Sequence, residues 1–288
     1  MEIDSSHIFS LAEAYEDFLS ASFYSLWSKL PIDPLALDAF SVIGALLSRQ
    51  VTLSIQLARS PNTWNGHSAP LFLRSQIDLH ITLAWILGEL EERAKLFILH
   101  GLGEEKLIIE HFAHSVDIHP DSPSNDLVQG LVEAKRAWIN SQRAEWMVEV
   151  NLGNWSRLDT RKMALESNCE GLYKFAYKPF SQAAHSMWPH ISLHNARPCT
   201  NPLHRYHLIP ELLETLLDVD YLYRSCKYVH RSYEAVIKAF AIEPVGSMPL
   251  DWLDHEIDKL TEKIDTEEDA DGLFMGGQHN AAPDPPPE

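Results

Sequence analysis

Glycine is scarce in this sequence, with 12 residues in 288, against roughly 7% in an average protein. This scarcity disfavours folds that need many tight turns or a glycine-rich phosphate loop, and it favours long helices. Cysteine is also rare: Cys169, Cys199 and Cys226 are an odd number without C-x-x-C spacing. Such usage disfavours a disulfide framework or a zinc knot and predicts a reducing, cytoplasmic location.

Basic residues and long apolar runs are lacking as well. Lys and Arg number 23 against 41 Asp and Glu, which gives a net charge of −18. This balance disfavours wholesale binding of nucleic acid or an anionic membrane, although a local basic site stays open. The longest strongly apolar run, 79–87, is less than half of a membrane span of roughly 20 residues, and the acidic start MEIDSSHIFS is unlike a signal peptide. We therefore expect no membrane partner.

Helical periodicity is present from end to end, and no convincing alternating strand is found. The pattern predicts an all-α helical bundle of about eight to ten helices, a single domain over 1–264. Its acidic, proline-containing tail, 265–288, is predicted to be disordered. The expected helices cover 5–29, 34–59, 70–90, 91–100, 103–116, 125–150, 160–178, 180–188, 211–241 and 249–264, with an irregular loop over 189–210.

The strongest periodic signal lies in the 211–241 helix, where apolar residues recur in steps of four and three. Such a seam suits either the core of the bundle or a homo-oligomer contact.

The familiar catalytic signatures are missing, because the chain has no P-loop, no G-x-G-x-x-G, no G-x-S-x-G and no H-E-x-x-H. A di-iron bundle needs Glu-x-x-His on two helices, and no Glu here has His three residues on. Glu110, His111, His114 and His119 form the nearest metal-like cluster, which is more typical of a solvated polar face. We therefore expect no metal and no cofactor.

Acids are absent from a 40-residue segment, 171–210, where about six would be expected at the average of this chain. The segment carries four cations as candidate anion ligands and five histidines. A local positive potential of this kind attracts a phosphate, a nucleotide or an RNA backbone; the alternative is a segment that docks on acids of its own chain. The four cations are Lys174, Lys178, Arg197 and Arg205.

Tyr173, Tyr177, Ser181 and His185 stand four residues apart within this segment. They share one helix face if the helix passes through Pro179 with only a kink, whereas a fresh helix at Pro179 would break the alignment. Histidine, serine and tyrosine together supply a base, a hydroxyl and a phenolic donor. The same set also forms ordinary structural hydrogen-bond clusters.

An opposite pair of charges, Arg74 and Asp78, stands at i, i+4 on the most apolar helix. The pair should face the interior, either as a structural ion pair or with Arg74 aimed at an anion. We expect it to meet Tyr177 and Ser181 in one polar pocket, with His185 within hydrogen-bond or one-water reach.

Arg-Ser-x-x-acid at 74–78, followed by Tyr-x3-Ser-x3-His at 177–185, resembles a bacterial helical family of unknown function over about residues 40–240. That family looks similar in helical layout to the HEPN proteins, many of which are metal-independent ribonucleases of toxin and phage-defence systems. The HEPN motif, an Arg and a His four to six residues apart, is matched by Arg224 and His230, although His230 lies on the apolar seam.

Two functions remain open. The first is a metal-independent endoribonuclease or phosphoryl-transfer enzyme acting on RNA or a nucleotide. In it, His185 is the acid or base, Arg74 stabilises the charge, Tyr177 and Ser181 donate hydrogen bonds, and Asp78 orients Arg74. The second is a non-catalytic helical module that binds a partner or a small anionic ligand.

Overall fold

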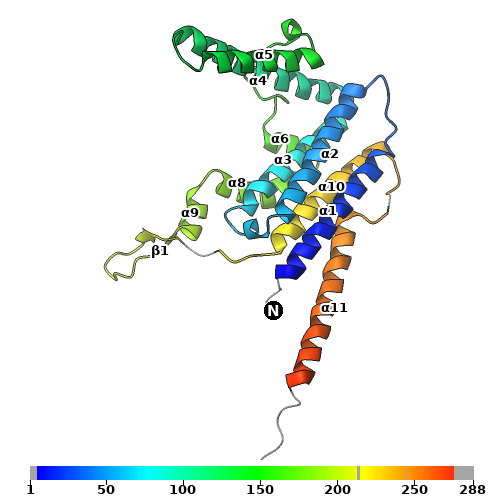
Figure 1. Ribbon diagram of the computed structural model, residues 1–288, viewed down its shortest axis with the longest axis vertical. Helices are drawn as coiled ribbons and strands as arrows, with labels where there is room; N and C mark the ends of the chain where they lie inside the picture. The colour runs from blue at the N-terminus through cyan, green and yellow to red at the C-terminus, as the bar shows by residue number, and fades with distance from the viewer. Residues whose placement is uncertain (1–4, 213–214, 245, 276–288) are drawn as a thin grey trace, which may run out of the picture.

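The computed structural model describes residues 5–212, 215–244 and 246–275. Four long helices lie side by side and form the body of the protein (Figure 1): α1 (Ser5–Trp27), α2 (Leu37–Ala58), α3 (Ala69–Gly88) and α10 (Asp220–Phe240). Their apolar faces share one core, in which Leu47, Ile77 and Val229 are at most 1% exposed. The helix α3 is apolar on most of its sides because it is covered by α2, α10 and α8 (Lys178–Ala184). The predicted all-α class is confirmed.

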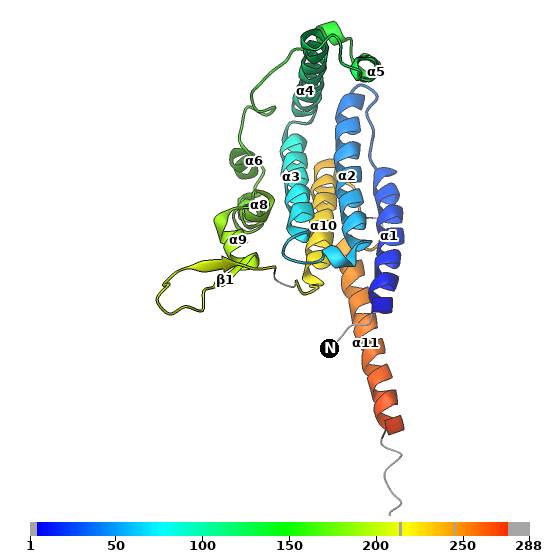
Figure 2. The same cartoon turned by 60° about the vertical axis from the view of Figure 1, so that its left-hand side comes forward.

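A helical hairpin of α4 (Leu90–Ile118) and α5 (Asn125–Gln142) caps one end of the body (Figures 1 and 2). It has a small apolar core of its own, consisting of Leu102, Ile109, Val132, Ile139 and Val148. The expectation of two helices over 91–100 and 103–116 is wrong, since α4 continues through Gly101 and Gly103. Gly103 serves close packing instead, because a Cβ there would lie 2.6 Å from the carbonyl oxygen of Glu149.

The chain after α5 departs from the expected helix over 125–150. It leaves the helix at Gln142, and a short 3-10 turn, Glu145–Met147, carries the following residues back across α4. This return places the backbone of 148–150 against Gly103.

Short helical pieces replace the single helix expected over 160–178. They are α6 (Thr160–Glu166), α7 (Glu170–Leu172) and a π-helical turn, Tyr173–Tyr177, that leads into α8. Asp159 caps α6 by accepting the backbone N–H of Lys162 at 2.8 Å. The left-handed backbone of Asn168 (φ 58°) separates α6 from α7, because a residue with positive φ cannot continue a right-handed helix.

The segment expected as an irregular loop, 189–210, contains regular structure. It holds α9 (Trp188–His194), which starts with a proline in its first turn, and a hairpin of β1 (Ala196–Pro198) and β2 (Leu208–Pro210). The strands are antiparallel with Arg197 opposite Ile209. The expectation of no strand therefore fails at this hairpin, which projects from the side of the body in both views (Figures 1 and 2).

The seam helix α10 begins at Asp220 rather than at 211, and it ends at Ala241 in a left-handed conformation (φ 49°). Its seam packs within the chain, against α2, α3 and α11 (Pro249–Met275). A homo-oligomer is therefore not needed to cover the seam, and the predicted oligomer stays a prediction. The last predicted helix extends to Met275, and the end of the predicted tail, 276–288, lies outside the described residues.

One helix in the part of the chain that the structure describes is long and apolar enough to cross a membrane. It is α2, and 56% of its most apolar window is buried inside the protein. A buried core helix of a soluble protein passes the same test, so this feature is weak evidence for a membrane span.

Candidate functional site

The predicted meeting of α3 with the 173–185 segment is present, and Arg74 is at its centre. Its Nε donates to Ser181 Oγ at 2.7 Å, and its two terminal nitrogens donate to Asp78 and to the hydroxyl of Tyr177. The guanidinium carbon also lies 3.4 Å from the centroid of the Tyr177 ring. Four of the five predicted catalytic residues therefore form one contiguous cluster.

The π-helical turn brings Tyr177 and Ser181 onto the same face. Pro179 has no N–H to donate to the carbonyl four residues earlier, and the backbone N–H of Lys178 donates instead to the carbonyl of Tyr173, five residues back. The helix thus continues through Pro179, and Ser181 Oγ donates to the carbonyl of Tyr177 at 2.8 Å. The rings of Tyr173 and Tyr177 stack with centroids 4.9 Å apart.

The side chain of Arg74 is only 15% exposed, whereas that of Asp78 is 43% exposed. Burial raises the pKa of Asp78, and the hydrogen bond and positive charge of Arg74 partly oppose the shift. Burial also raises the pKa of Tyr177, whose hydroxyl donates to Thr160 at 3.3 Å. Thr160 is a member that the sequence analysis missed, because nothing in its sequence context marks the start of α6 as a neighbour of α3.

All three nitrogens of the Arg74 guanidinium are occupied by side chains of the same chain. These three bonds fix the position of α8 on α3, and they engage three of the five N–H groups that a guanidinium carries. The cluster therefore has the geometry of a structural clamp between helices.

His185 is not part of this cluster. It ends α8, its side chain is exposed, and its described contact is the backbone bond from its N–H to the carbonyl of Ser181 at 3.0 Å. No direct hydrogen bond joins His185 to Arg74 or Asp78 among the described residues, since α8 stops at Ala184 and the backbone turns at Ser186 (φ 48°); one-water reach stays a prediction.

The cations of the acid-free segment are partly neutralised by acids at its two borders. Lys174 pairs with Glu170 at 2.6 Å, and Arg197 pairs with Glu211 at 3.0 Å. Arg205 stacks on the ring of its neighbour Tyr206, and Lys178 is exposed. The four cations therefore do not converge on one anion site.

The second candidate pair, Arg224 and His230, does not converge either. Arg224 pairs with Asp220 at 2.5 Å. His230 Nδ1 accepts the backbone N–H of Leu250 at 3.2 Å and so helps to fix the start of α11. In the metal-like group on and after α4, all four side chains are exposed; they are Glu110, His111, His114 and His119.

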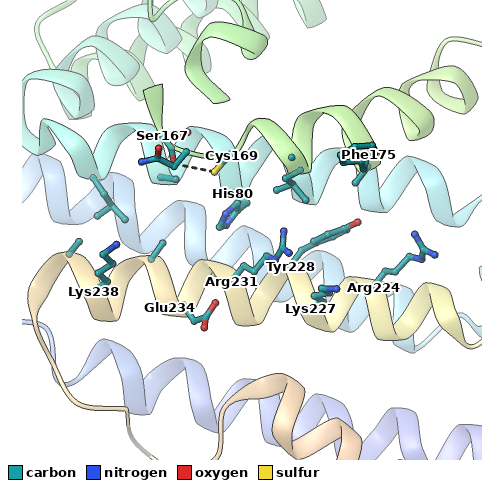
Figure 3. A pocket seen from close by; sticks show the side chains of 18 of the residues that line it. His80, Ser167, Cys169, Phe175, Arg224, Lys227, Tyr228, Arg231, Glu234 and Lys238 are labelled. Atoms are coloured by element: carbon teal, nitrogen blue, oxygen red, sulfur yellow. Dashed lines mark hydrogen bonds between the residues drawn. The ribbon is translucent and has the colours of Figure 1, made fainter. Parts of the chain in front are cut away.

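A groove of about 1250 Å³ lies between α10, α3 and the 166–176 segment. Figure 3 shows Arg224, Lys227, Arg231 and Lys238 along α10, with His80 of α3 opposite them. These four cations recur at helical spacing and lie on one side of α10. The exposed ring of Phe175 lies on the opposite wall, at one end of the groove.

The acids that line this groove are engaged with partners of their own. Glu166 accepts the indole N–H of Trp85 at 2.7 Å, and Asp220 accepts from Arg224. Glu234 lies 3.5 Å from His230 and points away from His80 (Figure 3). Among the described residues, no carboxylate lies within salt-bridge distance of Lys227, Arg231 or Lys238.

Burial shifts the pKa values of a histidine, a tyrosine and a cysteine that line the groove. Burial, with a contribution from the charge of Arg231, lowers the pKa of His80 to about 4. Its Nδ1 lies 3.1 Å from Ser232 Oγ. Burial raises the pKa of Tyr228 to about 12 and raises that of Cys169. These three groups are therefore neutral near pH 7.

The fold and the groove together define an all-helical protein with a cation-lined groove. Comparison with known protein families gives a match over residues 40–200 to a family of unknown function, DUF5677, and the chain belongs to that family. No curated protein and no solved structure matches the chain. None of these comparisons links the chain to the HEPN proteins, so that likeness stays a prediction.

Proposed function

We propose that this protein is a helical module that binds an extended, phosphate-bearing anion in the groove beside α10. The observation that carries the proposal is the row of Lys227, Arg231 and Lys238, which face one open groove without a carboxylate partner among the described residues. A protein of net charge −18 in which three cations of one groove have no carboxylate partner among the described residues has a local site for a negative ligand.

The shape of the groove favours a chain of phosphates over a single one. Arg224 and Lys238 are 14 positions apart, which is about 21 Å along a helix. A single phosphate would contact only one or two of the cations, whereas a short single-stranded RNA could contact several. The exposed Phe175 ring offers a surface on which a base can stack.

Binding is favoured over catalysis because His80, the histidine among the described residues that line the groove, is not suited to act as a general base at neutral pH. A general base works best with a pKa near the operating pH, and His80 lies well below it. The predicted catalytic histidine, His185, is outside both the groove and the Arg74 cluster. The cations of the groove lie on α10, beyond the matched residues 40–200, so the proposal concerns this chain and not the whole family.

The test is fluorescence anisotropy of a short labelled single-stranded RNA at low salt, with the full chain and EDTA. Arg231→Gln and Lys227→Ala should each weaken binding several-fold, whereas Lys95→Ala, an exposed lysine of α4, should leave it unchanged. Equal binding by all variants would refute the proposal that the RNA binds in this groove.

The same samples are run on a gel after incubation, which tests the ribonuclease alternative. Intact RNA is expected. Cleavage by the wild type that disappears in His185→Ala would replace the binding proposal with the nuclease.

A further inference from the structure

The turn of the β1–β2 hairpin gathers three side chains that ligate transition metals. Cys199, His204 and His207 each place one ligand atom so that all three atoms lie within 4.8 Å of one another. The spacing Cys-x4-His-x2-His is not one of the common zinc-finger spacings. We propose that this turn is a binding site for Zn²⁺ or a similar borderline-soft ion, with three protein ligands and one open position.

One ligand pair is already at the separation that a tetrahedral zinc ion requires. Cys199 Sγ and His204 Nδ1 are 3.6 Å apart. Zinc bonds of about 2.3 Å to sulfur and about 2.0–2.1 Å to nitrogen, at a tetrahedral angle, place the two ligand atoms about 3.6 Å apart. An ion can therefore enter between these two atoms with little change in their separation.

The backbone of the turn is organised around the same residues. The N–H of Cys199 donates to the carbonyl of His207 at 2.9 Å, which extends the β1–β2 ladder by one bond and holds the two ligands opposite each other. Tyr206 has a left-handed backbone (φ 65°), and this conformation turns the chain just before His207. The arrangement holds the ligands before an ion arrives, which lowers the ordering cost of binding.

A neighbouring backbone N–H supports the sulfur, and the side chain of Asn201 lies beside the first imidazole. The backbone N–H of Asn201 lies 3.5 Å from Cys199 Sγ, and such a donor stabilises a thiolate. The side-chain amide of Asn201 lies 3.2 Å from His204 Nε2, on the ring nitrogen opposite the one that faces sulfur. A ligating histidine is usually oriented by an acceptor at this outer nitrogen, which the NH₂ group of Asn201 does not supply.

The lack of acids in the 171–210 segment selects the kind of ion. Mg²⁺ and Ca²⁺ need oxygen ligands, chiefly carboxylates, and this segment contains no Asp or Glu. A thiolate with two imidazoles suits zinc and related ions. His204 and His207 are exposed, so the fourth position faces solvent and can accept a water molecule or a small ligand.

The test uses the full chain and Co²⁺ as a spectroscopic probe, followed by Zn²⁺ competition against a chromophoric chelator. One equivalent of Co²⁺ should produce a thiolate-to-metal charge-transfer band that Zn²⁺ abolishes. Cys199→Ser should lose the band, and His207→Ala should weaken zinc binding by more than about tenfold, because disturbing even an outer partner of a ligand has effects of this size.

Cys169→Ser and His185→Ala are the matched controls, since they remove a cysteine and an exposed histidine outside the turn, and both should bind like the wild type. A wild type without the band would overturn the proposal. Zinc binding by Cys199→Ser as tight as that of the wild type would overturn it too, because exposed histidines alone would then account for the binding.

Discussion

The guanidinium of Arg74 lies over the ring of Tyr177, with its central carbon 3.4 Å from the ring centroid. The two residues are 103 positions apart in the sequence and come from different helices. Their stacking, together with the bonds of Arg74 to Ser181 and Asp78, makes the planar shape of the side chain as important as its charge. A lysine could keep the charge but could not reproduce the fork or the stack.

Arg74→Lys should therefore lower the free energy of unfolding by about 1–2 kcal/mol, because at least one neutral partner loses its hydrogen bond in a half-buried site. Urea denaturation monitored by circular dichroism measures the change. Arg161→Lys, at an exposed position of α6, is the matched control and should change stability by less than about 0.5 kcal/mol. Equal stability of Arg74→Lys and the wild type would show that only the charge matters.

His80 should make the stability of the protein depend on pH. Its pKa is lowered to about 4 in the folded state, against about 6.5 when unfolded. The unfolded chain therefore binds the proton more readily, and stability falls as pH decreases from 6.5 towards 4. The loss contributed by His80 is about 2 kcal/mol at pH 5 relative to pH 7.5.

His80→Gln removes the titrating group, so this variant should lose less stability than the wild type between pH 7.5 and pH 5. Urea midpoints at the two pH values give the comparison. His111→Gln changes an exposed histidine of α4 and should retain the full dependence. Identical slopes in the wild type and His80→Gln would mean that the pKa of His80 is not lowered in the folded state.

The groove proposal also predicts how binding responds to salt. Each phosphate contact to single-stranded nucleic acid contributes a slope of about −0.7 to the plot of log affinity against log salt concentration. Lys227→Ala should reduce the magnitude of the slope by about this amount, whereas Lys95→Ala should not. Parallel plots for the wild type and Lys227→Ala would place the bound anion elsewhere.

Asn201→Asp should tighten zinc binding at the proposed hairpin site by about tenfold. A metal on His204 Nδ1 leaves the proton on Nε2, which then needs an acceptor, but the nearest group is the NH₂ of Asn201. A carboxylate would accept that proton, as in the carboxylate–histidine–zinc arrangement of known sites. Chelator competition on the two proteins measures the change, and weaker binding by Asn201→Asp would exclude Nδ1 as the ligand atom.

The sequence could predict those features that depend only on residues close to one another in the chain. The apolar length of α3 and the four-residue spacing of Arg74 with Asp78, and of Tyr177 with Ser181, were sufficient to place these side chains in one cluster. His185 does not join the cluster because the helix ends before it. Helical spacing predicts the direction of a side chain only for residues within the helix. The end of α8 at Ala184 leaves no comparable signal in the sequence.

The groove and the hairpin depend on relationships that no local pattern contains. The cations of α10 matter because the 166–176 segment lies opposite them and leaves a groove between. The width of this groove is set by tertiary packing. Cys199 and His207 face each other only because two three-residue strands pair. The spacing of cysteine and histidines was visible in the sequence, but it matches no standard zinc motif, so it predicted no site.

The separate apolar core of α4 and α5 has a consequence for how the molecule opens. Those five residues pack with one another and with Ile98 and Phe112, in a cluster distinct from the main core, so the hairpin can lose its protection while the body remains intact. Its amide hydrogens should exchange with solvent through a local opening whose free energy is below that of global unfolding. The half of α4 that packs on the body, around Ala94, should exchange with the main core, so that a single helix spans two units of different dynamics.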